Sequence, residues 1–567
     1  MTHAADDEEA LGPEAAATVS GQPVTAGITL IPDDFEGDLP LEQLGGFVVI
    51  GRVVNWEHSP SFTSIAALLE PTYEVRPAQF LGVWHGRERN VLTVIQVGDS
   101  FEVNPNEVPE LAAARSRLGL PRSYGAEGVS TRIFRLAECA TVEEFDLRQR
   151  AGEWDIDGVG RAPELLARAG DPVVLLPPNV VTASIGGLPD PSAGLDLGST
   201  AGVDGVPVVL KPDALQFHIG IFGNPGQGKS YLTGAIMEEA VAWGVPSLVL
   251  DINGEFTRAA RELRGTVITL PDPARFGLSL NLISPQELVS ITPNVQPNTV
   301  YAELIELAHD QLRTEARGRR ITFDDLRERI AKIGESTKAA KPSIGAAIAR
   351  VSTLEKDPLV GGNFDFVKEL EDHQLVVLDC RFLSLRQTQL IAAMGARELQ
   401  RIGRERARKA EEGDAEAASW FALYFVDEAH AVIPDDEQVV STQVHFELAR
   451  MGRHVRTGLV LSSQSPADLN ASVLKRLQTR FVFALERDQL RSIQGVLADL
   501  DEQIVNQLPK LQRGVCAVSG SSDLIRHGFL LRVRSRRTHA GGSTPRVFSG
   551  RAKTMPVGNP STRRADD

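Results

Sequence analysis

The spacing of hydrophobic residues changes at about residue 202. Before that point, short apolar runs are separated by Gly, Pro and Asp. Many short strands with turn residues between them predict a small β-barrel over residues 27–202. A helix at about residues 108–118 interrupts the series. The predicted strands lie at residues 47–54, 80–84, 91–97 and 172–176.

Short apolar strands alternate with helical segments in the second part of the chain, residues 203–535. This alternation predicts an α/β domain with a mainly parallel sheet covered on both faces. A helix-rich insertion is expected at about residues 284–367. The predicted strands are residues 219–222, 247–250, 375–378, 423–426, 458–462 and 480–485.

The two ends of the chain lack such patterns. Residues 1–26 are acidic and rich in Ala, which predicts a disordered tail. Residues 536–567 are rich in Arg, Gly, Pro, Ser and Thr, which predicts a flexible C-terminal arm.

A glycine-rich stretch at residues 223–230 fits the phosphate-loop pattern G-x-x-x-x-G-K-[ST] at every required position. It follows a predicted strand at residues 217–222 and precedes a predicted helix at residues 231–243. Backbone N–H groups and the helix N-terminus would therefore bind the phosphates of ATP. Lys229 would reach the β- and γ-phosphates, and Ser230 would hold Mg²⁺. The predicted nucleotide-binding residues are Gly223, Asn224, Pro225, Gly226, Gln227, Gly228, Lys229, Ser230 and Tyr231.

Polar residues that end the predicted strands supply the remaining chemistry. Asp427 and Glu428 follow an apolar strand, so Asp427 is predicted to bind Mg²⁺ and Glu428 to deprotonate the attacking water. Asp251 could bind the water shell of Mg²⁺ or position the nucleophile; the alternative is a cap of a Gly-containing turn. Gln464 could sense the γ-phosphate, although a Gln at a strand end is also common without a role.

Three arginines at a spacing of three, Arg450, Arg453 and Arg456, would share roughly one face of a helix or extended turn. A guanidinium can stabilise charge on the transferred phosphoryl group, in cis or from a neighbouring subunit. The alternative is a solvated basic face.

The composition narrows the class of protein. The chain has 567 residues, a length that predicts two to four domains. It contains no apolar run long enough to span a bilayer. Its three cysteines are far apart, and its N-terminus does not resemble a signal peptide, so a cytoplasmic protein without membrane association is expected. The net charge of −16 argues against a protein that coats nucleic acid, but it allows a ring with a basic channel.

Several further motifs, taken together with the phosphate loop, resemble the HerA family of ring ATPases, relatives of the FtsK-type DNA pumps. The resemblance covers most of the chain and includes the barrel before the ATPase core. The matching positions are His218, Asp251, Gly254, Glu255, Phe256, Asp427–His430, Ala449–Arg453, Ser462–Pro466, Leu508, Pro509 and Gly514.

The resemblance implies a RecA-like P-loop ATPase core in a hexameric translocase on double-stranded DNA. It also implies that the barrel docks a partner, often a nuclease, and that Arg453 contacts the nucleotide. Two positions depart from the family pattern. Residues 224–227 read Asn-Pro-Gly-Gln, and Phe217 stands where members often carry an arginine finger, so either another arginine replaces it or hydrolysis is weaker.

Three functions are compatible with these patterns. The first is an ATP-hydrolysing DNA motor in DNA processing or phage defence, with basic loop candidates at residues 313–320 and 401–409 that equally fit solvated helix faces. The second is a nucleotide-gated ring scaffold that assembles and activates a partner enzyme with little translocation. The third is a conjugation-type coupling ATPase, against which the lack of a membrane segment counts.

Overall fold

The computed structural model describes residues 43–44, 46–56, 59–70, 73–85, 89–103, 134–150, 153–201, 205–437, 439–521 and 523–539. The chain divides into two compact units, with the main division between Leu175 and Leu176; short segments at residues 75–80 and 96–99 belong to the second unit. The predictions for the tail at 1–26, the helix at 108–118 and residues 540–567 of the arm lie outside the described residues.

The first unit contains an antiparallel sheet that closes on itself. Strand β2 pairs with both β3 and β8, so the path β2-β3-β6-β5-β4-β8 returns to its start. This closed path agrees with the predicted barrel. The strands are β1 (Gln43–Leu44), β2 (Phe47–Val54), β3 (Ser64–Leu69), β4 (Phe80–Trp84), β5 (Val91–Val103), β6 (Phe134–Arg150), β7 (Glu153–Arg161) and β8 (Pro172–Leu175).

The second unit is built on an 11-stranded mixed sheet, with the order β10-β9-β19-β18-β17-β11-β16-β15-β12-β14-β13. From β17 to β13 all neighbours are parallel, and from β10 to β17 all are antiparallel. The strands are β9 (Leu195–Thr200), β10 (Pro207–Leu210), β11 (Ile219–Phe222), β12 (Ser247–Asp251), β13 (Thr266–Thr269), β14 (Leu375–Asp379), β15 (Ala422–Val426), β16 (Thr457–Ser463), β17 (Thr479–Val482), β18 (Val515–Gly520) and β19 (Phe529–Val533).

The central strands confirm the predicted parallel core. Every residue of β12, β14, β15 and β16 is buried, as expected for parallel strands covered on both faces. Strand β17 ends at Val482, whereas the predicted strand continued to residue 485.

The predicted domain boundary at residues 202 and 203 lies later than the observed division. Strand β9 pairs with β19 and β10, so residues 195–200 belong to the ATPase sheet rather than to the barrel. The sequence of this strand resembles the β-type runs before it, and only its pairing partners in the far C-terminal part of the chain assign it to the second unit.

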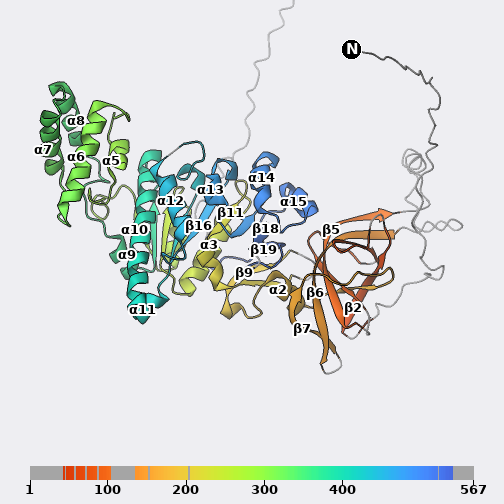
Figure 1. Cartoon of the computed structure of the whole chain (residues 1–567). Coiled ribbons are helices and arrows are strands. Elements are labelled where there is room, and N and C mark those ends of the chain that lie inside the picture. Colours follow the sequence, from red (N-terminus) through yellow and green to blue (C-terminus); the bar gives the residue numbers. More distant parts are fainter. Residues whose placement is uncertain are drawn as a thin grey trace, which may run out of the picture. The chain divides into compact units, whose positions relative to one another are not determined.

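Helices surround the parallel strands (Figure 1). The expected insertion is present as α5 (Pro285–Ile291), α6 (Val300–Ala316), α7 (Phe323–Ser336), α8 (Lys341–Leu354) and α9 (Phe366–Asp372). Capping boxes begin α5 and α7, with Ser284 and Thr322 as the N-cap residues. The other α-helices are α2 (Pro178–Ile185), α3 (Lys229–Ala242), α4 (Thr257–Glu262), α10 (Leu385–Glu411), α11 (Ala415–Ser419), α12 (Val440–Met451), α13 (Ala471–Leu474), α14 (Arg487–Ile493) and α15 (Glu502–Gln507).

The long helix α10 packs directly on β15. The Tyr424 hydroxyl donates a 3.0 Å hydrogen bond to the Ala392 carbonyl of α10. The Tyr424 ring also stacks on the ring of His445 of α12, with 5.7 Å between the ring centroids. Within the part of the chain that the structure describes, no helix is both long and apolar enough to cross a membrane.

The buried His445 gives the fold a dependence on pH. Burial lowers the pKa of His445 to about 4, whereas the unfolded chain binds the proton near pH 6.5. Unfolding therefore takes up a proton between about pH 6.5 and 4, and stability falls as the pH falls through this window. We expect His445→Phe, which keeps the ring, to reduce the slope of unfolding free energy against pH by up to about 1.4 kcal/mol per pH unit. Denaturant unfolding of both proteins at pH 7, 6 and 5 measures this, and parallel curves would contradict it.

Candidate nucleotide site

The phosphate loop leaves β11 at Phe222 and enters α3 at Lys229. The Gln227 N–H bonds the Asn224 carbonyl at 3.3 Å, so residues 224–227 form a turn with Pro225 and Gly226 in its centre. Pro is favoured at the first central position, and Gly226, with φ 77°, meets the need for positive φ at the second. The unusual Asn-Pro-Gly-Gln sequence is therefore compatible with the loop, because this turn uses no N–H from Pro225.

Gly228 allows the loop to approach β17 closely. Its φ is 132°, and a Cβ at this position would lie 2.9 Å from Cε1 of Phe483. A larger residue here would push the loop away from the sheet or change its path. Helix α3 then begins at Lys229, and its N-terminus faces the loop as an anion site requires.

Five ionisable side chains lie near one another at the phosphate loop: Lys229 at the start of α3 and four acids at the ends of β12 and β15. Burial lowers the pKa of the Lys229 ammonium, and the carboxylates of Glu428, Asp427 and Glu255 act in the opposite direction. Burial also raises the pKa of Asp427 well above its usual range, and the neighbouring Glu428, Asp251 and Glu255 raise it further. The Asp427 and Glu428 carboxylates are therefore close enough to the Lys229 ammonium to influence its pKa.

A divalent cation near Asp427 would favour its ionised form. Mg²⁺ in nucleotide sites takes one or two protein oxygens together with phosphate oxygens and waters, so the Ser230 hydroxyl and the Asp427 carboxylate fit it. Among the residues that the structure describes, no group of three or more His, Cys, Asp or Glu side chains forms a metal site by itself. A bound nucleotide would thus have to supply part of the coordination.

Glu428 follows β15, and its side chain contacts the residue after β16. Its backbone adopts the left-handed conformation, φ 43° and ψ 51°, which is strained for a residue with a side chain. Its Oε2 accepts the backbone N–H of Gln464 at 3.4 Å and lies 3.5 Å from Nδ1 of His430. The same His430 nitrogen is 3.1 Å from the Ser463 hydroxyl. The carboxylate and the predicted sensor Gln464 therefore lie together at one edge of the sheet.

The list of site residues predicted from sequence lacked three that the structure brings here. His430 and Ser463 orient Glu428, and the Asn253 amide lies 3.5 Å from Oδ2 of Asp427. His430 follows β15, and Ser463 and Asn253 end or follow its neighbours β16 and β12. Their place at the carboxyl ends of parallel strands was the available signal.

Asp251 caps a turn instead of facing the nucleotide. Its Oδ1 accepts the N–H groups of Gly254 at 2.7 Å and Glu255 at 2.9 Å, and its Oδ2 accepts that of Phe256 at 2.9 Å. The side chain is fully buried, and burial raises its pKa to about 6. The predicted role near the nucleophile is therefore replaced by the alternative, a cap that holds Asn253 and Glu255 in place.

This assignment predicts that Asp251→Asn acts through stability. The variant keeps one acceptor oxygen but directs an amide at one of the N–H groups, so we expect the free energy of unfolding to fall by about 1–2 kcal/mol. Denaturant unfolding measures the loss. Unchanged stability with a more than ~100-fold loss of ATP hydrolysis would instead indicate direct participation in the reaction.

The three arginines do not share a helix face, contrary to the prediction. Arg450 lies in the last turn of α12, Arg453 lies in the turn that follows, and Arg456 has φ 49° and donates to the Ala418 carbonyl. Helix α12 ends at Met451, and the left-handed Arg456 departs from the helical spacing on which the prediction relied.

These arginines also lie at the opposite edge of the sheet from the phosphate loop. Strand β16 begins at Thr457, directly after Arg456, and its last residue, Ser463, pairs with Phe222 at the start of the loop. Seven residues of strand separate the two edges by roughly 20 Å, far more than the reach of an arginine side chain. None of the three can contact a nucleotide in its own subunit.

His218 anchors the turn that carries Arg453. Its Nε2 donates to the Ala449 carbonyl at 3.1 Å, and its Nδ1 accepts the Leu459 N–H at 3.0 Å. Burial lowers its pKa to about 4, so the ring is neutral at physiological pH. The Arg453 guanidinium lies 4.9 Å from the centroid of the Phe217 ring. The motif histidine therefore has a structural role, and the adjacent Phe217 holds the arginine.

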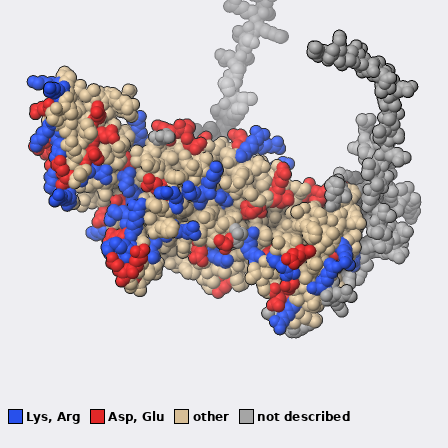
Figure 2. All heavy atoms as spheres, viewed as in Figure 1, with Lys and Arg blue, Asp and Glu red and all other residues tan. Residues whose placement is uncertain are grey.

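Of the two basic runs that were candidates for DNA loops, residues 401–409 are mostly paired with acids, whereas in residues 313–320 only Arg319 forms an ion pair within the described part of the chain. Arg319 pairs with Asp325, Arg401 with Glu398, and Arg408 with Glu412. Blue and red spheres accordingly alternate over the insertion helices and over α10 and α11 (Figure 2). The run at residues 401–409 therefore fits the alternative interpretation, a solvated helix face, whereas residues 317–320 follow the end of α6.

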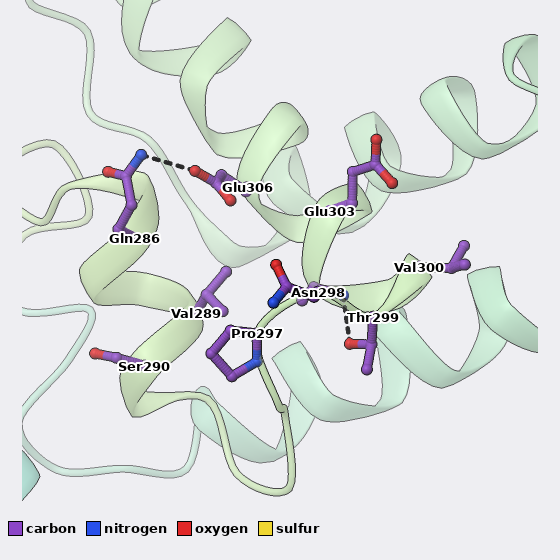
Figure 3. Close-up of a pocket in the computed structure, with 10 residues that line it drawn as sticks. Gln286, Val289, Ser290, Pro297, Asn298, Thr299, Val300, Glu303 and Glu306 are labelled. Carbon is purple, nitrogen blue, oxygen red and sulfur yellow. Dashed lines mark hydrogen bonds between the residues drawn. The ribbon is translucent and has the colours of Figure 1, made fainter. Parts of the chain in front are cut away.

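A pocket of about 380 Å³ lies in the insertion, between α5 and the start of α6 (Figure 3). The ten described residues that line it include Glu303 and Glu306 but no Lys or Arg. Gln286 donates to Glu306 at 2.7 Å across its rim. Carboxylates without cations disfavour phosphate, so the pocket does not compete with the phosphate loop as the nucleotide site.

Comparisons with known proteins agree with this geometry. Residues 195–399 match the family described as "Helicase HerA, central domain". The chain is 23% identical over 423 residues to the DNA double-strand break repair helicase HerA of Sulfolobus acidocaldarius, covering 69% of this chain and 78% of that protein. It is 24% identical over 381 residues to the probable DNA double-strand break repair helicase HerA of Methanocaldococcus jannaschii, covering 58% of this chain and 74% of the relative.

Solved structures were also found by similarity. One is VirB4 of Thermoanaerobacter pseudethanolicus, with a TM-score of 0.45, 16% identity, and coverage of 62% of this chain and 99% of that chain. Another is the plasmid coupling protein TrwB in complex with ADP and Mg²⁺, with a TM-score of 0.42, 14% identity, and coverage of 59% and 88%.

Proposed function

Because the chain carries the central domain of the HerA family of P-loop ATPases, we propose that it is an ATP-hydrolysing motor that moves along double-stranded DNA. The observation that supports this most strongly is the division of the site between the two edges of the sheet. Lys229, Asp427 and Glu428 gather at the edge of the phosphate loop, and Arg453 lies at the other. A complete site then needs two subunits, as in a ring.

Hydrolysis would use these residues in distinct roles. The loop binds the phosphates of ATP through backbone N–H groups, and Lys229 neutralises the β- and γ-phosphates. Ser230 and Asp427 would hold Mg²⁺, which would neutralise part of the phosphate charge. Glu428 accepts a proton from water as the water oxygen attacks the γ-phosphorus. The bond between the γ-phosphorus and the β–γ bridging oxygen breaks, which releases ADP and phosphate.

Two further residues would complete the site. Gln464, whose backbone N–H donates to Glu428, would sense whether the γ-phosphate is present. Arg453 from the neighbouring subunit would stabilise charge on the transferred group. Family members often carry an arginine at the position of Phe217. Arg453, whose guanidinium packs on the Phe217 ring, would take the place of that arginine. The nucleotide at the phosphate loop of one subunit would contact Arg453 of the next. Hydrolysis would change this contact and so move one subunit relative to the other.

The wider setting of this activity is also proposed from the relatives. The HerA relatives are named as double-strand break repair helicases, which supports a role in DNA processing. We assign the first unit the docking of a nuclease or other effector, in repair or phage defence, and six subunits to the ring. The free, buried Cys139, Cys380 and Cys516 are consistent with a reducing compartment such as the cytoplasm.

DNA-dependent hydrolysis tests the proposal. The rate of ATP hydrolysis is measured with and without linear duplex DNA, with Lys229→Ala as the blank. We expect strong stimulation by DNA that disappears in the variant. Hydrolysis that is sensitive to the variant but ignores DNA would favour the second candidate, a nucleotide-gated scaffold. The observation in favour of this candidate is that the basic residues at 401–409 are mostly paired with acids.

A further inference from the structure

The segment that follows β19 lies along the phosphate-loop helix. We call residues 534–539 the C-terminal strap. Arg534 donates to Glu238 at 2.9 Å and to Glu239 at 2.8 Å, both on α3. The predicted flexible arm began at residue 536, but residues 536–539 are held by these and the following contacts. A segment remote in sequence is thereby fixed to the helix that ends the phosphate loop.

Glu238 is the centre of this attachment. It accepts the backbone N–H groups of Arg537 at 3.1 Å and Thr538 at 2.8 Å, and the Thr538 hydroxyl at 2.6 Å. Burial alone would raise its pKa, but the bonds from Thr538, Arg537 and Arg534 leave the pKa below its usual value. Glu238 is therefore an ionised, fully bonded acid that holds the strap in one register.

Arg536 enters the space left by a glycine on α3. Its side chain is 2% exposed, and a methyl group at position 234 would overlap the guanidinium. Its Nη1 lies 3.5 Å from the Ser230 carbonyl, and its backbone N–H donates to the Tyr231 hydroxyl at 2.7 Å. The strap thus contacts two successive residues of the first turn, one the predicted Mg²⁺ ligand and the other a predicted nucleotide contact.

The charge of Arg536 is only partly compensated. Its Nη2 donates to the Thr538 hydroxyl at 2.8 Å, its Nε has no hydrogen-bond partner, and the nearest Glu238 oxygen is 3.8 Å away. Burying a cation in this way costs free energy. Attachment of the strap alone does not require this cost, because Arg534 and Thr538 already attach the strap to α3. A buried positive charge beside the first turn of α3 adds to the positive potential of the helix N-terminus, where phosphates bind.

We propose that Arg536 is a positioning residue for nucleotide binding: the C-terminal strap sets the first turn of α3 and adds positive charge to the phosphate site. Strap docking and nucleotide binding are then coupled, and each strengthens the other. The inference rests on nucleotide binding at the phosphate loop but not on DNA movement, so it survives a failure of the DNA test above.

The test compares full-length variants by the KM and kcat of basal ATP hydrolysis and by the Kd of a fluorescent ATP analogue. We expect Arg536→Gln to raise both KM and Kd by about tenfold with kcat changed less than about threefold. Arg536→Lys, which keeps the charge, should recover part of the loss. The matched control is Arg537→Gln, because the neighbouring Arg537 side chain is 55% exposed and pairs with Glu239 and Asp196 instead of contacting the first turn of α3.

Gly234→Ala supplies an independent approach that leaves Arg536 unchanged. Its methyl group expels the guanidinium, so it should raise KM and Kd about as much as Arg536→Gln, and the double variant should be no worse than either alone. Multiplying effects would overturn the proposal, as would an unchanged Kd in Arg536→Gln with a lowered melting temperature.

Hydrogen exchange gives a readout on the unaltered protein. The amide hydrogens of Arg537 and Thr538 bond Glu238, so they report whether the strap is docked. We expect a non-hydrolysable ATP analogue to slow their exchange. Exchange that is indifferent to the nucleotide would contradict the coupling even if the variants failed to fold.

Discussion

Glu428→Gln is expected to reduce kcat for ATP hydrolysis by about 10²–10⁴-fold while ATP still binds. The amide can replace the carboxylate as acceptor of the Gln464 N–H, so the fold of the site is preserved, but it cannot take a proton from water. Steady-state hydrolysis and the Kd of a fluorescent ATP analogue separate these effects.

The control for this substitution is Glu405→Gln on α10, whose side chain is 48% exposed and paired with Lys409. It makes the same chemical change outside the nucleotide site and should hydrolyse ATP at the wild-type rate. A Glu428→Gln protein within about tenfold of wild type would mean that another group deprotonates the water.

Arg453→Ala is expected to lower kcat by about 10³-fold or more, because an arginine finger contributes effects of this size. Arg453 lies some seven strand residues from its own phosphate loop, so we expect it to act on the nucleotide of a neighbouring subunit. Mixing two inactive variants tests that expectation. An Arg453→Ala subunit keeps Glu428, and a Glu428→Gln subunit keeps Arg453, so their shared interface restores a complete site.

Randomly mixed rings should therefore regain about a quarter of the wild-type rate, since one interface in four combines both intact residues. An arginine acting in its own subunit would give no recovery at any ratio. Co-purification of differently tagged subunits shows that mixing occurred, and an absence of recovery in such mixed rings would contradict the trans assignment. Arg450→Ala, in the preceding helical turn, is the companion variant that shows whether the effect is specific to Arg453.

The phosphate loop and the acids of β15 could be predicted from sequence because their information is local. The glycine pattern, the strand before it and the helix after it lie within about 25 residues, and each can be recognised from its own residues. The same holds for Asp427 and Glu428, which a buried strand delivers to one edge of a parallel sheet.

The other features depended on contacts between distant segments. The register of β11 against β16 decides which edge of the sheet carries Arg453. This register cannot be predicted from the spacing of the residues along the chain. Asp251 differs from Asp427 only in having three N–H groups aimed at it by its own turn. Arg536 looked like part of a low-complexity arm, because the Gly234 notch that receives it is about 300 residues away.

Displacement of a third strand from duplex DNA tests the central claim most directly. A short triplex placed at one end of a linear duplex is removed only by a protein that moves along the duplex. The account predicts displacement that needs ATP, fails with Lys229→Ala and Glu428→Gln, and is unaffected by Glu405→Gln. Rapid, DNA-stimulated ATP hydrolysis by the wild-type ring without any displacement would contradict it.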